Sequence, residues 1–343
     1  MKAARLYGYK DVRVEEVMLD KLSSQEVMIG VEWCGLCGSD KHAYLSQIPI
    51  PSLPVTLGHE FSGTVKEVGE EVTNVKAGDR VVVNPLFVCG QCDNCRRGYP
   101  NLCKNIIPYG YHEKSGAFAE EAIVKDYMVT KIPDELPLDN AAIVEPTGIA
   151  IHALRISRFR AGDNAAVFGA GTIGLLLTSL LKNAGARNII VVGHTESKRA
   201  LATKLGATRV IDPDREDALQ IINDITDGNG VDIAFDIAGA QQTFSLGIKA
   251  LRARGEFVYV GLPQGDIKMN VFEAMIKEIQ ITMSYCTIDD FPIAVDFLAK
   301  DIMDVDGIIT KKISLDDIVQ EGFESLLHDK DQLKILVTPK PIV

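Results

Sequence analysis

The chain has 343 residues, of which 46% are hydrophobic and 24% are charged. These values fit a folded globular protein of about two domains, and they exclude a disordered or fibrous chain. The net charge of -11 would repel nucleic acid and anionic lipid, and the densest basic cluster is only the pair Arg96 and Arg97.

The N-terminus lacks the apolar segment of a secretory signal, and the least charged stretch, residues 165–181, is interrupted by glycines and is short for a membrane span. We therefore expect a soluble cytoplasmic protein without a membrane partner. Its cysteines should be reduced there. Six of them gather at positions 34, 37, 89, 92, 95 and 103, which favours metal binding over a disulfide framework.

Short apolar runs alternate with glycine turns between residues 26 and 90, which predicts antiparallel strands in a β-rich domain. After Glu145 and Pro146, strands alternate with helical patterns, which predicts a parallel sheet with crossover helices. A helix-rich tail from about residue 290 ends in the apolar strand Lys334–Thr338. The predicted fold class is α/β, with one domain formed by residues 1–146 and 287–343 and the other by residues 147–286.

The strongest chemical motif is a group of four cysteines within fifteen residues, Cys89, Cys92, Cys95 and Cys103. Four thiolates at this spacing can surround one metal ion in a closed tetrahedral shell, and zinc is the ion that this shell favours. An iron–sulfur cluster uses similar spacing and is the alternative. A closed shell leaves no position for a substrate, so this site is predicted to be structural.

A second metal constellation is dispersed along the chain, with Cys37 in one segment and the pair His59 and Glu60 in another. Sulfur, imidazole and carboxylate together form a mixed shell with a position left for water, as in catalytic zinc sites. Each residue alone also has a purely structural explanation. Cys34 lies at an apolar strand end, so we expect a buried thiol there rather than half of a redox pair with Cys37.

The third motif is the glycine pattern of residues 169–174, GAGTIG, which follows an apolar strand and precedes an apolar helix. In this setting the glycines allow backbone N–H groups to approach a pyrophosphate at the helix N-terminus. The segment is predicted to bind a dinucleotide through Gly169, Gly171, Thr172, Ile173 and Gly174.

These motifs together resemble the zinc-containing medium-chain dehydrogenases, in the branch of sorbitol, 2,3-butanediol and threonine dehydrogenases. The resemblance covers essentially the whole chain, and it implies a GroES-like catalytic domain followed by a Rossmann domain. Residues 309–313, 322–323 and 337–339 are most similar to butanediol dehydrogenases, whereas the four-cysteine segment is more similar to sorbitol and threonine dehydrogenases.

The resemblance implies two zinc ions per chain, one of them held by Cys37, His59 and Glu60. Relatives of the liver alcohol dehydrogenase kind add a second cysteine, but this chain has Glu145 at that place, either bound to the metal or linked through water. The resemblance also implies a proton relay from the substrate through Ser39 and the cofactor ribose towards His42. A turn-capping hydroxyl and a solvated histidine are the alternatives for these two residues.

The predicted function is hydride transfer between a secondary alcohol of a small polyol or vicinal diol, or the matching ketone, and a nicotinamide cofactor. The alternatives are a dehydrogenase for threonine or a sugar-alcohol phosphate, a non-catalytic nucleotide-binding protein on the same fold, and a nucleic-acid-binding zinc protein, which the negative charge disfavours. Tyr44, Tyr109 and Phe118 either line the substrate pocket or pack in the core.

NADP(H) is favoured over NAD(H), because the strand Asn188–Val192 is followed by Gly193 where NAD enzymes place an acid for the ribose 2′-hydroxyl. Lys198 or Arg199 could hold a 2′-phosphate. Alternatively, these two cations only solvate the following helix, and Glu196 reaches the ribose. The remaining expected cofactor contacts are His194, Thr195, Gly261, Leu262, Ser284 and Tyr285.

The resemblance further implies a homodimer or homotetramer joined through edge strands of the cofactor domain. Phe257–Val260, Leu262 and Ile267 are apolar enough to form such an edge, although burial in the core explains them equally well.

Overall fold

The computed structural model describes residues 1–112, 116–263 and 265–342. The chain forms two compact units, the first made of Met1–Glu145, Thr287–Lys300 and Ile309–Val343, and the second of Pro146–Cys286 and Asp301–Ile308. The segment 301–308, which the sequence analysis grouped with the first domain, belongs to the second unit. Its Asp306 pairs there with Lys204 at 3.5 Å.

The first unit is built on a β-sheet with the strand order β10-β6-β5-β3-β18-β17, in which β9 also pairs with β3. The central strand β3 alternates buried with partly buried side chains, as a strand with one face on the core should. The strands of this sheet are β3 (Glu26–Leu36), β5 (Glu60–Val68), β6 (Arg80–Val83), β9 (Glu121–Lys125), β10 (Val129–Lys131), β17 (Ile309–Ser314) and β18 (Lys334–Thr338).

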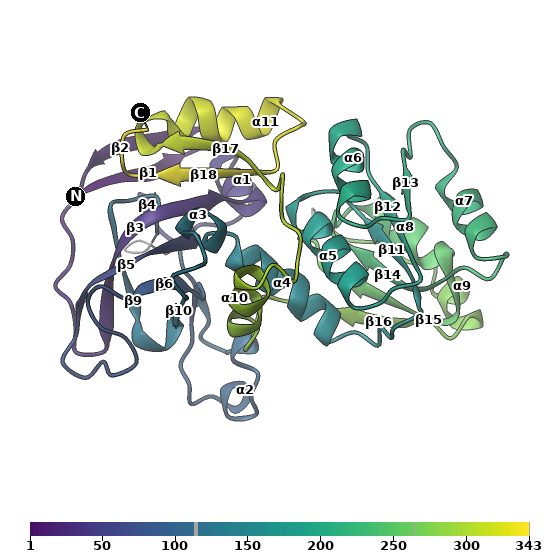
Figure 1. Cartoon of the computed structure of the whole chain (residues 1–343), viewed down its shortest axis with the longest axis horizontal. Helices are drawn as coiled ribbons and strands as arrows, with labels where there is room; N and C mark the ends of the chain where they lie inside the picture. The colour runs from purple at the N-terminus through teal and green to yellow at the C-terminus, as the bar shows by residue number, and fades with distance from the viewer. Residues whose placement is uncertain (113–115, 264, 343) are drawn as a thin grey trace. The chain divides into compact units, whose positions relative to one another are not determined.

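Two smaller sheets flank it, and their strands are β1 (Lys2–Gly8), β2 (Asp11–Glu16) and β4 (Val55–Thr56) in one, and β7 (Leu86–Phe87) and β8 (Ile107–Pro108) in the other. Short helices connect the strands of the unit (Figure 1), namely α1 (Gly38–Tyr44), α2 (Asp93–Arg96), α3 (Leu138–Ala141), α10 (Phe291–Ala299) and α11 (Ser325–His328). A π-helical segment, Ile318–Glu324, leads into α11.

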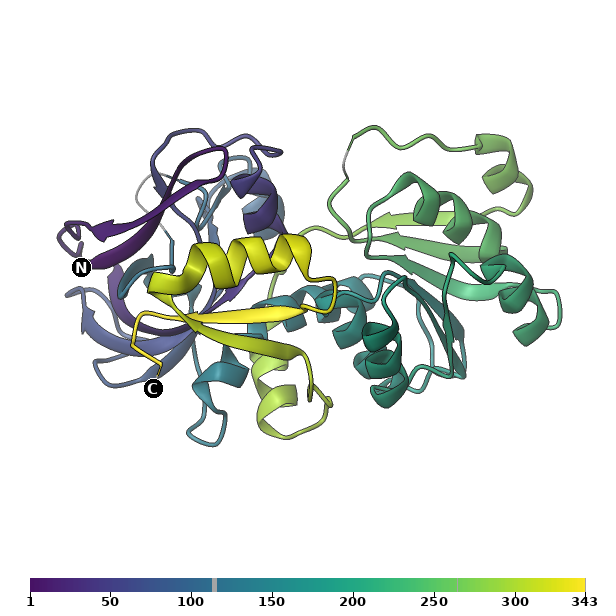
Figure 2. The ribbon, with the colours of Figure 1, turned by 90° about the horizontal axis from the view of Figure 1, so that it is seen from above.

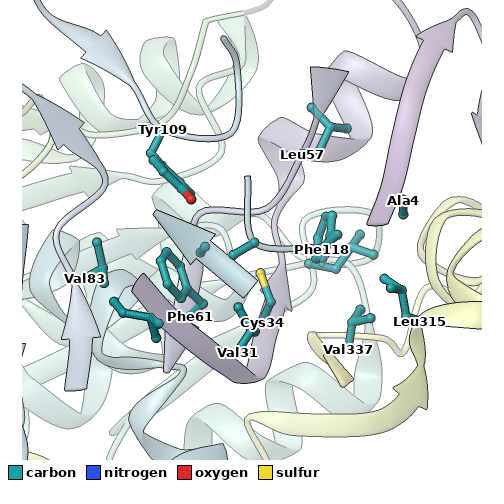
Figure 3. Packing of buried hydrophobic residues seen from close by; sticks show 14 of the residues in the cluster. Ala4, Val31, Cys34, Leu57, Phe61, Val83, Tyr109, Phe118, Leu315 and Val337 are labelled. Carbon is teal, nitrogen blue, oxygen red and sulfur yellow. The ribbon is translucent and has the colours of Figure 1, made fainter. Parts of the chain in front are cut away.

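The core of the first unit contains Cys34, which has no exposed surface and lies near Phe61 and Phe118 (Figure 3). Its burial confirms the predicted buried thiol and raises the pKa of Cys34, which disfavours the reactive thiolate. Tyr44, Tyr109 and Phe118 are each only 1% exposed and belong to the same cluster. They therefore pack in the core, and Tyr109 also borders a cavity of the first unit that is lined by Arg5 and Phe87 among others.

The second unit is a parallel sheet with the strand order β13-β12-β11-β14-β15-β16. All of Ala165–Phe168 is buried, so both faces of β11 are covered, since successive side chains point to opposite faces. Figures 1 and 2 show the helices packed beside this sheet. This doubly wound arrangement confirms the predicted α/β fold.

The strands of the second unit are β11 (Asn164–Phe168), β12 (Asn188–Val192), β13 (Arg209–Ile211), β14 (Val231–Asp236), β15 (Leu251–Tyr259) and β16 (Gln280–Met283). Its helices are α5 (Thr172–Asn183), α6 (Glu196–Lys204), α7 (Ala218–Ile225), α8 (Gln241–Ala250) and α9 (Val271–Ile276), while α4 (Val144–Arg155) begins at the end of the first unit. Among the described residues, no helix combines the length and apolar character needed to cross a membrane.

Candidate active site and metal centres

The four cysteines of the predicted structural site converge around one point in the segment that contains α2. The Sγ atom of Cys92 lies 3.5 Å from that of Cys95 and 3.9 Å from that of Cys103, and the Sγ atoms of Cys103 and Cys89 are 3.5 Å apart. A tetrahedral ion with metal–sulfur bonds of about 2.3 Å requires sulfur–sulfur separations of about 3.8 Å. The geometry therefore fits a zinc ion without rearrangement.

Backbone amides point at these sulfur atoms. The Cys92 N–H lies 3.3 Å from Cys89 Sγ, and the N–H groups of Cys89 and Asn105 lie 3.3 and 3.4 Å from Cys103 Sγ. Hydrogen bonds from backbone amides lower the pKa of Cys89, and they lower that of Cys92 to about 6. Burial and the neighbouring thiols raise the pKa of Cys95 to about 12. The amides therefore favour the thiolate, the form of cysteine that binds metal, at Cys89 and Cys92.

The mixed ligand set assembles at the end of β3 and the start of β5. One ligand atom from each of Cys37, His59 and Glu60 lies within 4.8 Å of the others. The antiparallel register pairs Gly35 of β3 with Glu60, which brings the residue after β3 to the two residues at the start of β5. The register thus brings Cys37 and His59, which are 22 residues apart in the sequence, close together. The three donor types suit a zinc ion with one open position.

Asp40 and Tyr111 orient His59, and the sequence analysis missed both. The Nδ1 atom of His59 is 3.5 Å from Asp40 Oδ1 and 3.5 Å from the Tyr111 hydroxyl. A carboxylate on one ring nitrogen is the usual support for a histidine that binds metal through the other. Asp40 also accepts a hydrogen bond of 2.9 Å from the Cys37 N–H, which caps α1. The spacing of Asp40 three residues after Cys37 was a readable capping signal, whereas Tyr111 had none.

Glu60 forms a buried ion pair with Lys334, a residue that also escaped the sequence analysis. Glu145, the second residue of α4, does not belong to the tight ligand cluster but is close enough to Glu60 for their charges to interact. Burial raises the pKa of Glu145 to about 7, and repulsion by Glu60 adds to the shift. This placement is compatible with direct binding to the metal or with a bridging water.

The two predicted relay residues have different partners. Tyr111 donates a hydrogen bond of 2.7 Å to Ser39 Oγ, and burial raises the Tyr111 pKa, so its hydroxyl remains a proton donor. His42 interacts through Nδ1 with Gln47 Oε1 at 2.6 Å. Ser39 is therefore connected to the His59 environment through Tyr111, while the expected step from Ser39 to His42 through a cofactor ribose stays a prediction.

The glycine motif lies between β11 and α5 and lines a cavity of about 430 Å³, within the range of about 300–1,000 Å³ for ligand pockets. Gly174 has no space for a side chain, because a Cβ atom would lie 1.9 Å from the Gly169 carbonyl oxygen. Gly169 itself has a φ of +115°, a backbone conformation that favours glycine. Thr172 and Ile173 form the first turn of α5, whose N-terminus favours bound anions.

The segment after β12 forms the far wall of this cavity. Gly193, His194, Thr195 and Lys198 line it. Arg199 is directed elsewhere, since its guanidinium donates to the carbonyls of Gly193 and His194 and lies 3.0 Å from Asp212.

Other predicted cofactor residues lie outside the cavity lining. Gly261, Leu262, Ser284 and Tyr285 follow β15 and β16 and are not among the described residues that line it. The sequence analysis instead missed Asp214, which lines the cavity and lies 2.8 Å from His194 Nδ1.

Comparison with protein families gives matches in both parts of the chain. Residues 23–134 match the alcohol dehydrogenase GroES-like domain, and residues 172–300 match the family described as zinc-binding dehydrogenase. An (R,R)-butanediol dehydrogenase of Bacillus subtilis strain 168 is 39% identical over 99% of this chain and 100% of its own. A sorbitol dehydrogenase of the same strain is 34% identical over 99% of this chain and 97% of its own.

Solved structures show the same fold with cofactors bound. A zinc-binding dehydrogenase from Sinorhizobium meliloti 1021, bound to NADP, has a TM-score of 0.92 at 31% identity, covering 98% of this chain and 99% of its own. An alcohol dehydrogenase from Escherichia coli CFT073, complexed with NADH, has a TM-score of 0.92 at 26% identity, covering 98% of this chain and 99% of its own.

Metal analysis can separate the two candidate centres. We expect two zinc ions per chain in the wild type and one in either Cys95→Ser or His59→Ala. Cys95→Ser should also lower the thermal unfolding temperature, because the segment around α2 would lose the ion that holds it together. Two ions in either variant, or fewer than two in zinc-repleted wild type, would contradict this assignment.

Proposed function

Because the chain belongs to the zinc-binding medium-chain dehydrogenases, in the branch of the polyol and diol dehydrogenases, we propose that its substrate is a small vicinal diol or polyol, or the matching ketone. It is an alcohol dehydrogenase that transfers a hydride between its substrate and a nicotinamide cofactor. The mixed cluster of Cys37, His59 and Glu60 carries the proposal, because a non-catalytic nucleotide-binding protein has no need of a metal site with an open position. The identity of 39% with a butanediol dehydrogenase favours a vicinal diol as the first substrate to test.

Each side chain of the site has a distinct task in this proposal. Cys37, His59 and Glu60 hold the zinc ion, which when bound polarises the substrate oxygen as a Lewis acid. Asp40 fixes the orientation of the His59 ring, and Tyr111 supports it from the hydroxyl side. Glu145 approaches the same ligands as a further carboxylate.

Proton removal is the task of the polar groups around the ligands. Ser39 Oγ accepts a hydrogen bond from Tyr111, so the serine hydroxyl hydrogen is free to be directed to a substrate or a cofactor ribose. We propose that Ser39 passes the proton onward and that His42, paired with Gln47, receives it.

The four thiolates of the structural site require a reducing compartment, and the cytoplasm is the proposed location.

A panel of substrates with purified holoenzyme tests the activity. We expect turnover with 2,3-butanediol stereoisomers, acetoin or short polyols. His59→Ala should lower kcat by at least about a hundredfold, and its circular dichroism spectrum should match that of the wild type. His328→Ala, at a residue exposed on α11, is the matched control and should keep wild-type rates. Turnover of none of the diols, polyols or ketones would contradict the proposed function.

We propose NADP(H) as the preferred cofactor. The support is the absence of an acid directly after β12, together with Lys198 and Thr195 in the lining of the cofactor cavity. Because Arg199 is engaged by two carbonyls and Asp212, Lys198 is the cation assigned to the 2′-phosphate. NAD(H) is the alternative, favoured by the carboxylate of Asp214 at the edge of the cavity.

The ratio of kcat/KM for NADP to that for NAD decides between the cofactors. We expect the wild type to prefer NADP, and Lys198→Ala to lower the ratio by about tenfold to a hundredfold, since it removes a charged hydrogen bond. Lys204→Ala, on the same helix but paired with Asp306, is the control and should leave the ratio unchanged. A preference for NAD that Lys198→Ala does not alter would contradict the 2′-phosphate site.

We also propose a homodimer or homotetramer, with a corrected interface. Phe257–Val260 does not form a sheet edge, because β15 lies between β14 and β16. The edge strands of the described sheet are β13 and β16. Directly before β16 in the chain, α9 exposes a patch consisting of Val271, Phe272, Met275 and Ile276, each at least 60% exposed. Exposed apolar side chains in such a group are typical of an interface.

Charged substitutions in this patch test the assembly. We expect wild-type protein to be at least dimeric by light scattering at micromolar concentration, and Phe272→Asp combined with Met275→Asp to shift it to smaller species. Met18→Asp, at a side chain 98% exposed in the first unit, is the control. A monomeric wild type, or an unchanged assembly in the double variant, would contradict the proposal.

A further inference from the structure

Lys334 is a buried lysine within the candidate active site, with no role in the reaction as described so far. It is 2% exposed, and the side chain of its partner Glu60 is 1% exposed. Its ammonium group donates hydrogen bonds to Glu60 Oε2 and, at 3.3 Å, to the carbonyl oxygen of Leu36. A lysine is almost never this deeply buried unless its charge is compensated.

The sheet of the first unit places this ion pair beside the other ligands. Strand β18 begins with Lys334 and runs antiparallel to β3, pairing Leu336 with Gly35, and Gly35 in turn pairs with Glu60. Gly35 leaves the necessary space, because a Cβ atom there would lie 2.3 Å from Glu60 Oε2 and 3.0 Å from Lys334 Cδ. The ion pair is therefore built into three adjacent strands and requires a glycine between its partners.

The Lys334 ammonium also acts on the remaining candidate ligands. It contacts Glu60, and one carboxylate oxygen of Glu60 lies within 4.8 Å of the ligand atoms of Cys37 and His59. Several anionic groups are thus confined to one buried region. When no metal is bound there, Lys334 supplies the positive charge that such a group of anions needs.

We propose that Lys334 is a positioning residue whose positive charge compensates the anionic ligands while no metal is bound. Zinc binding then competes with the ion pair between Lys334 and Glu60. One oxygen of Glu60 is held by the ammonium group, which fixes the carboxylate before the metal arrives. The same positive charge repels Zn²⁺ and lowers its affinity. The inference rests on the catalytic zinc site of the proposed function.

The proposal predicts opposite effects on the metal-free and metal-bound protein. In Lys334→Met the carboxylate of Glu60 loses its partner, so the metal-free protein should unfold at a lower temperature. Added metal meets no competing positive charge in this variant, so it should bind about tenfold more tightly than to the wild type. An effect of this size is within the range of interaction energies measured between residues in contact. Lys334→Arg keeps the charge and should restore wild-type behaviour in both measurements.

Cobalt(II) is the probe that distinguishes the two metal centres. The open site is emptied with a chelator while zinc remains in the four-cysteine site, and Co²⁺ is then titrated into wild type, Lys334→Met and Lys334→Arg. The absorption of a site with one thiolate reports binding without reference to activity, and thermal unfolding is followed before and after metal addition. Unchanged or weaker Co²⁺ binding in Lys334→Met, with the wild-type absorption spectrum, would overturn the proposal.

A second pair of variants covers the case that Lys334→Met does not fold without metal. Glu60→Gln leaves the buried ammonium unpaired, and the double variant Glu60→Gln with Lys334→Met removes both charges. We expect the double variant to be more stable without metal than Glu60→Gln and to bind Co²⁺ more tightly; equal stability and equal affinity would overturn the proposal. A wild type that binds no Co²⁺ at this site and does not turn over diols would instead refute the proposed function.

Discussion

The pairing of β3 with β5 on one side and with β18 on the other is the constraint on which the candidate active site depends. Cys37 follows β3, His59 directly precedes β5 and Glu60 begins it, and Lys334 begins β18. Side chains from strands so distant in sequence meet because the registers fix which residues are neighbours. A shift of one residue in either register would direct Glu60 or Lys334 to the opposite face of the sheet.

The two candidate metal centres differ in how the fold produces them. The four cysteines lie close together in sequence, and backbone amides stabilise their thiolates locally, so the site needs little from the rest of the unit. The mixed cluster instead depends on long-range pairing, and its supporting groups Asp40 and Tyr111 come from separate segments. This difference agrees with a structural role for the first centre and a chemical role for the second.

The cofactor unit shows how close packing restricts a binding site. Gly174 packs against the Gly169 carbonyl, and a Cβ atom on Gly193 would lie 2.7 Å from the Cβ atom of Ala170. Neither position therefore has room for a side chain in this packing. Arg199 is diverted from the cavity by Asp212 at the end of the neighbouring strand β13. Lys198, which lines the cavity, is therefore the cation of this segment to which the proposed 2′-phosphate contact is assigned.

Local patterns in the sequence determined the α/β fold, the strand and helix order, the closed four-cysteine motif and the glycine motif, because each is encoded by residues near one another in the chain. Only the tertiary structure showed that Lys334 pairs with Glu60, that Tyr111 lies beside His59, and that Arg199 faces Asp212. It also showed that Tyr44, Tyr109 and Phe118 pack in the core, one of the two alternatives that the sequence left open, and that β15 lies inside the sheet and not at its edge. The physical reason is that these contacts depend on strand order and register over long sequence separations, which no local spacing of residues records.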